Sequence, residues 1–142
     1  MRLELSLRAD YAVRAMLALA VMDHASAVSA RRIAERMDIP ARFLPHVLTD
    51  LVRGGLVSGT TGRSGGYRLA RTADRISLLE IVDAVEEHGD PARCVLRGGP
   101  CGRDGRCAVH EAVSAASEAM RRELGNAHLA DLAARGGLPD PG

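Results

Sequence analysis

Two short amphipathic stretches joined by a tight turn strongly constrain the fold of this chain. Ser29 is a suitable N-cap for a helix over Ala30–Met37, and Asp38–Pro40 forms the turn. A second helix is predicted from Ala41 to about Arg53, because apolar residues recur there at helical spacing and Gly54–Gly55 follows. Two helices joined by a three-residue turn indicate a helix-turn-helix.

A glycine-rich hairpin is predicted immediately after the second helix. Apolar residues run over Leu56–Ser58 and Tyr67–Leu69, and the segment 59–66 between them holds four glycines and Arg63. Strand, glycine-rich loop and strand form a β-hairpin. The helices and the hairpin together predict a winged helix-turn-helix, whose second helix enters the major groove of DNA.

The remaining segments predict a chain that is mainly α-helical. Ser6 begins a helix that continues to about Asp23, and Ser77–Glu80 is a capping box that opens another helix. A long helix over 108–124 carries an apolar stripe with no sequence-local partner, and a short helix follows at 129–134. We expect the long helix to pair with a second copy, since winged-helix proteins usually bind palindromic half-sites as dimers.

All three cysteines of the chain lie in one glycine-rich stretch together with a histidine. Cys107 and His110 are three residues apart, so a helix that begins there would present both side chains on one face. Glycines keep the rest of the stretch flexible enough to bring Cys94 and Cys101 to the same centre. Cysteine and histidine in this arrangement predict a metal or iron–sulfur site.

The number of cysteines and the hydropathy of the chain indicate where in the cell the protein is expected. Three thiols cannot all pair within one chain, so we expect a reducing cytoplasm in which they remain available to a metal. No stretch approaches about 18 uninterrupted apolar residues, so no membrane contact is expected. The predicted parts are a winged helix-turn-helix DNA-binding domain (1–87), a cysteine-rich cluster-binding loop (88–107), a dimerisation helix with a short C-terminal helix (108–135) and a disordered tail (136–142).

Arginines supply most of the predicted DNA contacts, and the chain has no lysine among its 19 basic residues. Arg42, with Pro45 and His46, is an exposed early residue of the second helix, where a guanidinium reaches a guanine edge or a phosphate. Arg63 at the wing tip reaches a phosphate or a narrow minor groove. Further contacts to the DNA backbone are expected from Arg31, Arg32, Arg53 and Arg68.

Two less favourable interpretations apply to these same residues. The arginines could serve only to solvate the surface, an alternative that is strongest for Arg31 and Arg53. Pro45 is expected past the first turn of its helix, where it removes one helical hydrogen bond and kinks the helix near its start.

The order of these segments resembles a known family. Residues 1–20, 33–71, 76–85 and 92–113 are similar to the IscR/NsrR/RirA family of iron–sulfur transcription regulators, and the Gly-Gly-Tyr wing together with the three-cysteine loop is the specific feature. The resemblance implies a homodimer with a crossed long-helix interface. It also implies that the second helix and the wing bind DNA, under the control of a cluster in the cysteine loop.

The IscR branch gives the best match, because Cys107 and His110 fit its Cys-x-x-His pattern. The resemblance then implies a 2Fe–2S cluster with Cys94, Cys101, Cys107 and His110 as ligands. The gap from Cys94 to Cys101 is one residue longer than in that branch, and Thr61 stands where the family has its wing arginine. Asp10 falls where NsrR-type sensors use an aspartate of the other subunit as fourth ligand to a 4Fe–4S cluster, so it is the alternative fourth ligand.

Three functions are compared on these observations. The first is a transcription repressor whose DNA affinity depends on an iron–sulfur cluster that senses iron–sulfur status, redox state or nitric oxide. The second is a winged-helix regulator with a structural zinc in the Cys3His loop, because the spacing alone permits zinc. The third, an enzyme or electron carrier, is not expected: the chain has no Cys-x-x-Cys redox pair, and the wing glycines do not open a helix after a strand as a nucleotide-binding loop requires.

Overall fold

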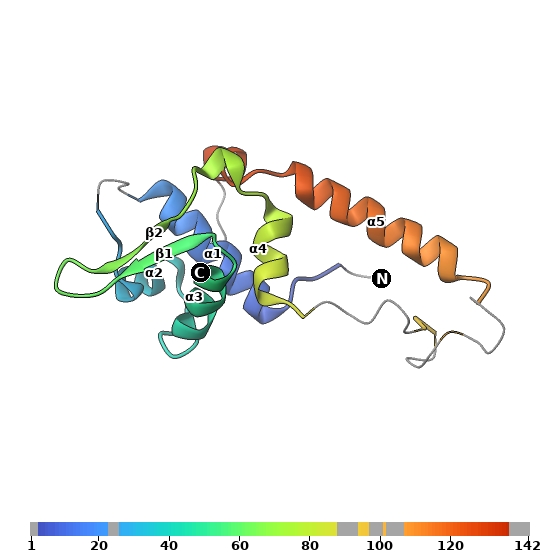
Figure 1. Ribbon diagram of the computed structural model, residues 1–142, viewed down its shortest axis with the longest axis horizontal. Helices are drawn as coiled ribbons and strands as arrows, with labels where there is room; N and C mark the ends of the chain where they lie inside the picture. The colour runs from blue at the N-terminus through green and yellow to red at the C-terminus, as the bar shows by residue number, and fades with distance from the viewer. Residues whose placement is uncertain (1–2, 23–25, 88–93, 97–100, 102–106, 137–142) are drawn as a thin grey trace.

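The computed structural model describes residues 3–22, 26–87, 94–96, 101 and 107–136. The helices and strands within these ranges are α1 (Leu7–Val21), α2 (Ala30–Met37), α3 (Leu44–Arg53), β1 (Val57–Thr60), β2 (Gly66–Leu69), the 3-10 turn η1 (Ala73–Arg75), α4 (Leu78–Val85), α5 (His110–Asn126) and α6 (Leu129–Arg135). Figure 1 shows helices α1 to α4 and the hairpin in one body, with α5 extending away from it. The predicted fold, mainly helical with a hairpin wing, is confirmed.

Helix α1 is the central element of the body. Its N-cap is Ser6, whose side chain accepts the N–H of Ala9, as the sequence predicts. The side chains that α1 buries are small or apolar, and α2, α3, α4 and α6 all pack against it. Four of its alanines are fully buried, which lets neighbouring backbones approach closely: Ala9, Ala12, Ala15 and Ala18. The helix ends at Val21, and the predicted end at Asp23 lies outside the described residues.

The helix-turn-helix forms as predicted, with one correction. Helix α2 has its predicted bounds, and Asp38 ends it in the left-handed conformation at φ 52°. Helix α3 begins at Leu44 rather than at residue 41, because 41–43 form a turn. Pro45 therefore lies at the second helical position, where no intrahelical N–H bond exists to be lost. The predicted cost and kink at Pro45 are wrong for this reason.

The wing is a two-stranded antiparallel hairpin whose strands extend further toward the tip than predicted. Val57 pairs with Leu69 at its base and Thr60 with Gly66 near its tip. Val28, just before α2, adds two backbone hydrogen bonds to Tyr67, of 2.8 and 2.7 Å, and so ties the wing to the helices. Gly66 has φ 151°, and a Cβ there would lie 2.5 Å from the Val28 carbonyl oxygen, so only glycine permits this close approach.

The C-terminal helix α6 packs on the same body as the wing. The predicted capping box opens α4: the Ser77 hydroxyl accepts the Glu80 N–H and the Glu80 carboxylate accepts the Ser77 N–H. Leu129 is fully buried, and its N–H donates to the Ile76 carbonyl at 2.8 Å. The sequence predicts that residues 108–135 form one part of the protein. In the structure α6 contacts α1 and η1, whereas α5 extends away from them.

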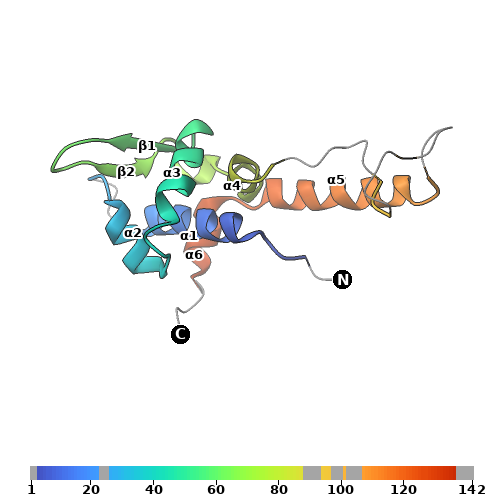
Figure 2. The same cartoon turned by 90° about the horizontal axis from the view of Figure 1, so that it is seen from below.

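Helix α5 leaves the body on the side opposite the wing, as Figures 1 and 2 both show. None of its residues is buried, and Val113 and Met120 of its apolar stripe are 40% and 39% exposed. Arg121 anchors the helix to α4 through two hydrogen bonds to Asp83, of 3.1 and 2.8 Å. No helix among the described residues is both long and apolar enough to cross a membrane.

Candidate metal centre and nucleic-acid interface

The three cysteines converge at the start of α5, at the end of the molecule away from the wing (Figure 1). Their Sγ atoms all lie within 4.8 Å of one another, and those of Cys94 and Cys107 are 3.9 Å apart. Cys94 is buried, whereas Cys101 and Cys107 are partly exposed. The predicted convergence of three thiols on one centre is present in the structure.

Hydrogen bonding at this centre acts on Cys101. Its Sγ accepts the backbone N–H of Cys107 at 3.0 Å, which favours the thiolate and is the largest influence lowering the pKa of Cys101. The Cys107 thiol, loss of solvent and the Cys94 thiol act in the opposite direction, and the net result is a raised pKa. The Cys101 thiol therefore holds its proton more tightly than usual until a cation takes its place.

The donor set suits a thiophilic metal. Thiolates bind zinc and the irons of iron–sulfur clusters, and the burial of Cys94 keeps water from part of the site. Two sulfur ligands of one tetrahedral ion, with bonds of about 2.3 Å, lie about 3.8 Å apart. The separation of 3.9 Å between the Cys94 and Cys107 sulfurs is close to that value.

His110 is near the cysteines, but not in the way predicted. Helix α5 begins at His110 and residues 108–109 form the turn before it, so Cys107 lies outside the helix and the two residues do not share a helix face. The His110 backbone N–H donates to the Cys107 carbonyl at 3.0 Å, and the His110 side chain is half-buried. Among the described residues, the group with converging ligand atoms consists of the three cysteines, without the His110 ring.

Asp10 has a partner within its own chain. Its carboxylate accepts two hydrogen bonds from Arg14, at 2.7 and 3.3 Å, one helical turn further along α1. Arg14 also reaches the Met37 carbonyl at the end of α2, at 3.4 Å. The Asp10 carboxylate is therefore engaged in an ion pair within its own helix.

The predicted DNA-binding residues of α3 lie together around its N-terminus. Arg42 belongs to the turn before the helix, and its Cζ atom lies 4.8 Å from the centre of the Phe43 ring. Pro45 and His46 are exposed in the first turn. Thr49 is also exposed one turn later, on the same face as Pro45, and its hydroxyl donates to the Pro45 carbonyl at 2.8 Å.

The other predicted DNA contacts divide into two kinds. Thr61 and Arg63 are exposed at the wing tip, and Arg68 is exposed on β2. Arg32 and Arg53 are exposed on α2 and at the end of α3. Arg31 instead forms an ion pair with Glu35 at 2.9 Å, one turn along α2, as a side chain that only solvates the surface would.

Comparison with known proteins assigns the family. The model of the Rrf2 family, described as an iron-dependent transcriptional regulator, matches residues 5–135. The chain belongs to the Rrf2 family. The resemblance seen in the sequence is thereby confirmed, and this Rrf2 protein is a transcriptional regulator rather than an enzyme.

Individual relatives agree with the Rrf2 assignment. The regulator IscR of Xenorhabdus nematophila is 36% identical over 130 residues, covering 92% of this chain and 79% of the relative. IscR of Escherichia coli is 35% identical over the same length, covering 92% and 80%. The solved structure of T. potens IscR superposes with a TM-score of 0.75 at 26% identity, covering 94% of this chain and 88% of that one. CymR of B. subtilis, at 24% identity and a TM-score of 0.77, shares the fold.

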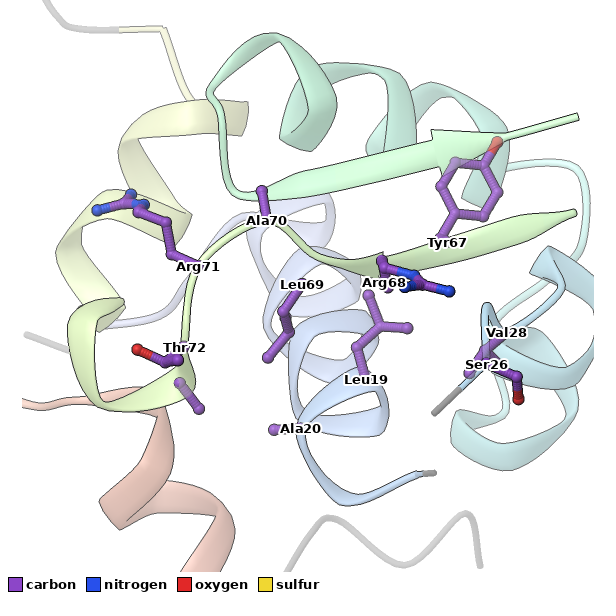
Figure 3. A pocket seen from close by; sticks show the side chains of 11 residues that line it. Leu19, Ala20, Ser26, Val28, Tyr67, Arg68, Leu69, Ala70, Arg71 and Thr72 are labelled. Atoms are coloured by element: carbon purple, nitrogen blue, oxygen red, sulfur yellow. The ribbon is translucent and has the colours of Figure 1, made fainter. Parts of the chain in front are cut away.

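A separate cavity of this Rrf2 chain lies between the end of α1 and strand β2 (Figure 3). It has a volume of about 480 Å³ and is lined by apolar residues such as Leu19, Val28 and Leu69. Arg71, also in its lining, is paired with Glu80 at 2.9 Å. Neither the cysteines nor the residues of α3 line this cavity; of the predicted DNA contacts, Arg68 of β2 lies in its lining.

Proposed function

We propose that this Rrf2 regulator is a transcription repressor whose affinity for DNA is set by an iron–sulfur cluster. The observation that carries the proposal is the convergence of three thiols within 4.8 Å on a winged helix-turn-helix chain. Cys94, Cys101 and Cys107 would hold the cluster, which supplies one-electron chemistry and a centre that reacts with oxidants or nitric oxide. The cluster would report iron–sulfur status, redox state or nitric oxide.

DNA recognition in this proposal uses the N-terminus of α3 and the wing. The exposed Arg42 reaches a guanine edge or a phosphate in the major groove, with Pro45 and His46 beside it. Arg63, near Thr61, takes the place of the family's wing arginine. Contacts to the DNA backbone come from Arg32, Arg53 and Arg68, and from Arg31 if its ion pair with Glu35 opens.

A homodimer on a palindromic DNA operator completes the proposal. Val113 and Met120 of the apolar stripe on α5 remain 40% and 39% exposed although α4 packs against part of the helix, and a two-fold partner would bury them. Two copies related by this axis would present two α3 helices to two half-sites.

His110 is the proposed fourth ligand, and a 2Fe–2S cluster is favoured over 4Fe–4S. Support comes from the half-buried position of His110 directly after the two-residue turn that follows Cys107. Asp10 of the partner subunit is the alternative, and its ion pair with Arg14 would have to be broken or shared for it to bind iron. A neutral imidazole leaves the cluster less negative than a fourth thiolate does.

A structural zinc is the second candidate. Its support is that all three Sγ atoms lie within 4.8 Å of one another, close enough to share a single ion, whereas the 3.9 Å separation of two of them suits one tetrahedral zinc and one tetrahedral iron alike. A structural zinc would fix the cysteine loop and the start of α5 without responding to redox state.

Anaerobic purification followed by measurement of iron, acid-labile sulfide, zinc and the visible spectrum decides between the two. Brown protein with iron and sulfide in comparable amounts supports the cluster. Colourless protein with one zinc per chain overturns the cluster and supports the second candidate.

A further inference from the structure

Three side chains form a continuous stack in front of the first turn of α3. The Phe43 ring lies against the Tyr11 ring of α1, with centroids 5.9 Å apart and planes inclined by 29°. On Phe43, in turn, lies the Arg42 guanidinium, its Cζ atom 4.8 Å from the ring centre. We propose that Phe43 is a positioning residue that holds Arg42 in its DNA-binding orientation, an inference that rests on the proposed DNA contact of Arg42.

The location of the phenylalanine is unusual for so apolar a side chain. The chain has one Phe, two Tyr and no Trp, so aromatic rings are scarce. Its single Phe is not in the buried core but 37% exposed at the N-cap of α3. Tyr11 is half-buried and packs against the core, so the stack connects a rigid support to an exposed guanidinium.

The stack leaves the hydrogen-bonding groups of Arg42 available. An arginine attracted to an aromatic face uses none of its five N–H donors, whereas an ion pair uses at least one. Within the described part of the chain, no carboxylate pairs with Arg42, in contrast to Arg14 with Asp10 and Arg31 with Glu35. Arg42 is therefore held in place and still able to donate to a guanine or a phosphate.

Holding the guanidinium before DNA arrives increases affinity. A long side chain loses much rotamer freedom when it is fixed at an interface, and a contact that already restricts it reduces that loss. An exposed cation–aromatic contact of ordinary strength corresponds to a change of about two- to five-fold in affinity. The effect should appear at the base or phosphate that Arg42 contacts, rather than uniformly along the site.

The test uses the full-length, anaerobically purified protein and a duplex site selected from a randomised DNA pool. Sequence preference and affinity are measured for the wild type and for Phe43→Leu, Phe43→Tyr, Arg42→Ala and the Phe43→Leu/Arg42→Ala double variant. We expect Phe43→Leu to weaken binding about two- to five-fold and to flatten base preference at the positions that Arg42→Ala also affects. Phe43→Tyr keeps the ring and should restore both properties. In the Arg42→Ala background, Phe43→Leu should have no further effect.

Val52→Ala is the matched control, because Val52 is an apolar residue of α3 whose exposure of 40% is close to the 37% of Phe43. Thermal melting of each variant separates loss of folding from loss of positioning. An unchanged base preference in folded Phe43→Leu, or equal losses in both Arg42 backgrounds, would overturn the inference while leaving the proposed function intact. If the wild type selects no sequence at all, the DNA-binding proposal itself fails.

Discussion

The Sγ atoms of Cys94 and Cys107 lie 3.9 Å apart, although 13 positions separate the two residues in the chain. Cys107 immediately precedes the turn from which α5 begins, and Cys94 is one of the buried apolar residues. A metal bound between them would fix the start of α5 to the segment that follows α4. Binding of a metal to these two sulfurs would therefore be coupled to the position of α5, the proposed dimerisation helix.

Loss of any one cysteine should abolish metal binding. Cys94→Ala, Cys101→Ala and Cys107→Ala each remove one of the three thiolates, and the chain has no other cysteine to replace it. Each variant should purify anaerobically with little or no iron and sulfide. Ser114→Ala, on α5 but outside the cysteine group, is the control and should retain full content. A cysteine variant that retains the wild-type content of iron and sulfide would show that the substituted cysteine is not a ligand.

Substitution of His110 should change the cluster more than substitution of Asp10. In His110→Ala the fourth ligand is lost, so the visible spectrum and the iron content should change. In Asp10→Ala the main loss is the partly exposed ion pair with Arg14, which is worth about 1 kcal/mol. Arg14→Met is a control that removes the same pair from its other end. If His110→Ala keeps a native cluster and only Asp10→Ala alters it, Asp10 and not His110 is the fourth ligand.

Arg42 and Arg63 should have different effects on DNA binding. Arg42→Ala should cost about 1–3 kcal/mol and relax preference at one base position, because a base contact is lost. Arg63→Ala should weaken binding to all sequences and reduce the slope of affinity against salt, because a phosphate contact is lost. Titrations of fluorescent duplexes at several salt concentrations distinguish the two. Unchanged affinity and preference in Arg42→Ala would remove its base-reading role.

The capping box of α4 should contribute to stability in a pH-dependent way. The Ser77 N–H, followed by Arg71, holds the pKa of Glu80 below its ordinary value of 4.5. A lowered carboxyl pKa stabilises the folded state fully above the ordinary value, and the contribution declines as pH falls through the lower, folded pKa. Glu80→Gln should lower the free energy of unfolding at pH 7 by about 1 kcal/mol or less, since the carboxylate is partly exposed.

Denaturant unfolding of wild type and Glu80→Gln at pH 7 and near pH 3 checks this contribution. The difference in the free energy of unfolding between the two proteins should shrink in acid, as the pH falls toward and through the lowered pKa of Glu80. A difference that is the same at both pH values would show that shape, and not charge, stabilises the cap. Ser77→Ala should cost about 1 kcal/mol at either pH through loss of the hydroxyl acceptor.

Local signals explain which parts of the fold were predictable from the sequence. The N-caps Ser6, Ser29 and Ser77 act within three residues of their helices, so the starts of α1, α2 and α4 follow from the sequence. The start of α3 was placed three residues early because Ala41–Phe43 carry no strong turn signal. Pro45 held the missing information, since proline favours the first turn of a helix.

Long-range contacts explain what could not be predicted. The packing of Leu129 beside Ile76 and the pairing of Arg121 with Asp83 join segments that are 53 and 38 positions apart, and no local pattern encodes them. The three cysteines were predictable as a group because metal ligands must converge. The turn between Cys107 and His110 was not, because a spacing of three fits both a helix and the turn that precedes one.

DNA affinity measured with and without the metal centre tests the central claim most directly. The anaerobically purified protein and the same protein after removal of its metal are titrated with one selected operator duplex under identical salt. Control of DNA binding by the cluster predicts affinities that differ by about 5- to 150-fold, the usual range of allosteric coupling. Equal affinities for the two folded forms would contradict it.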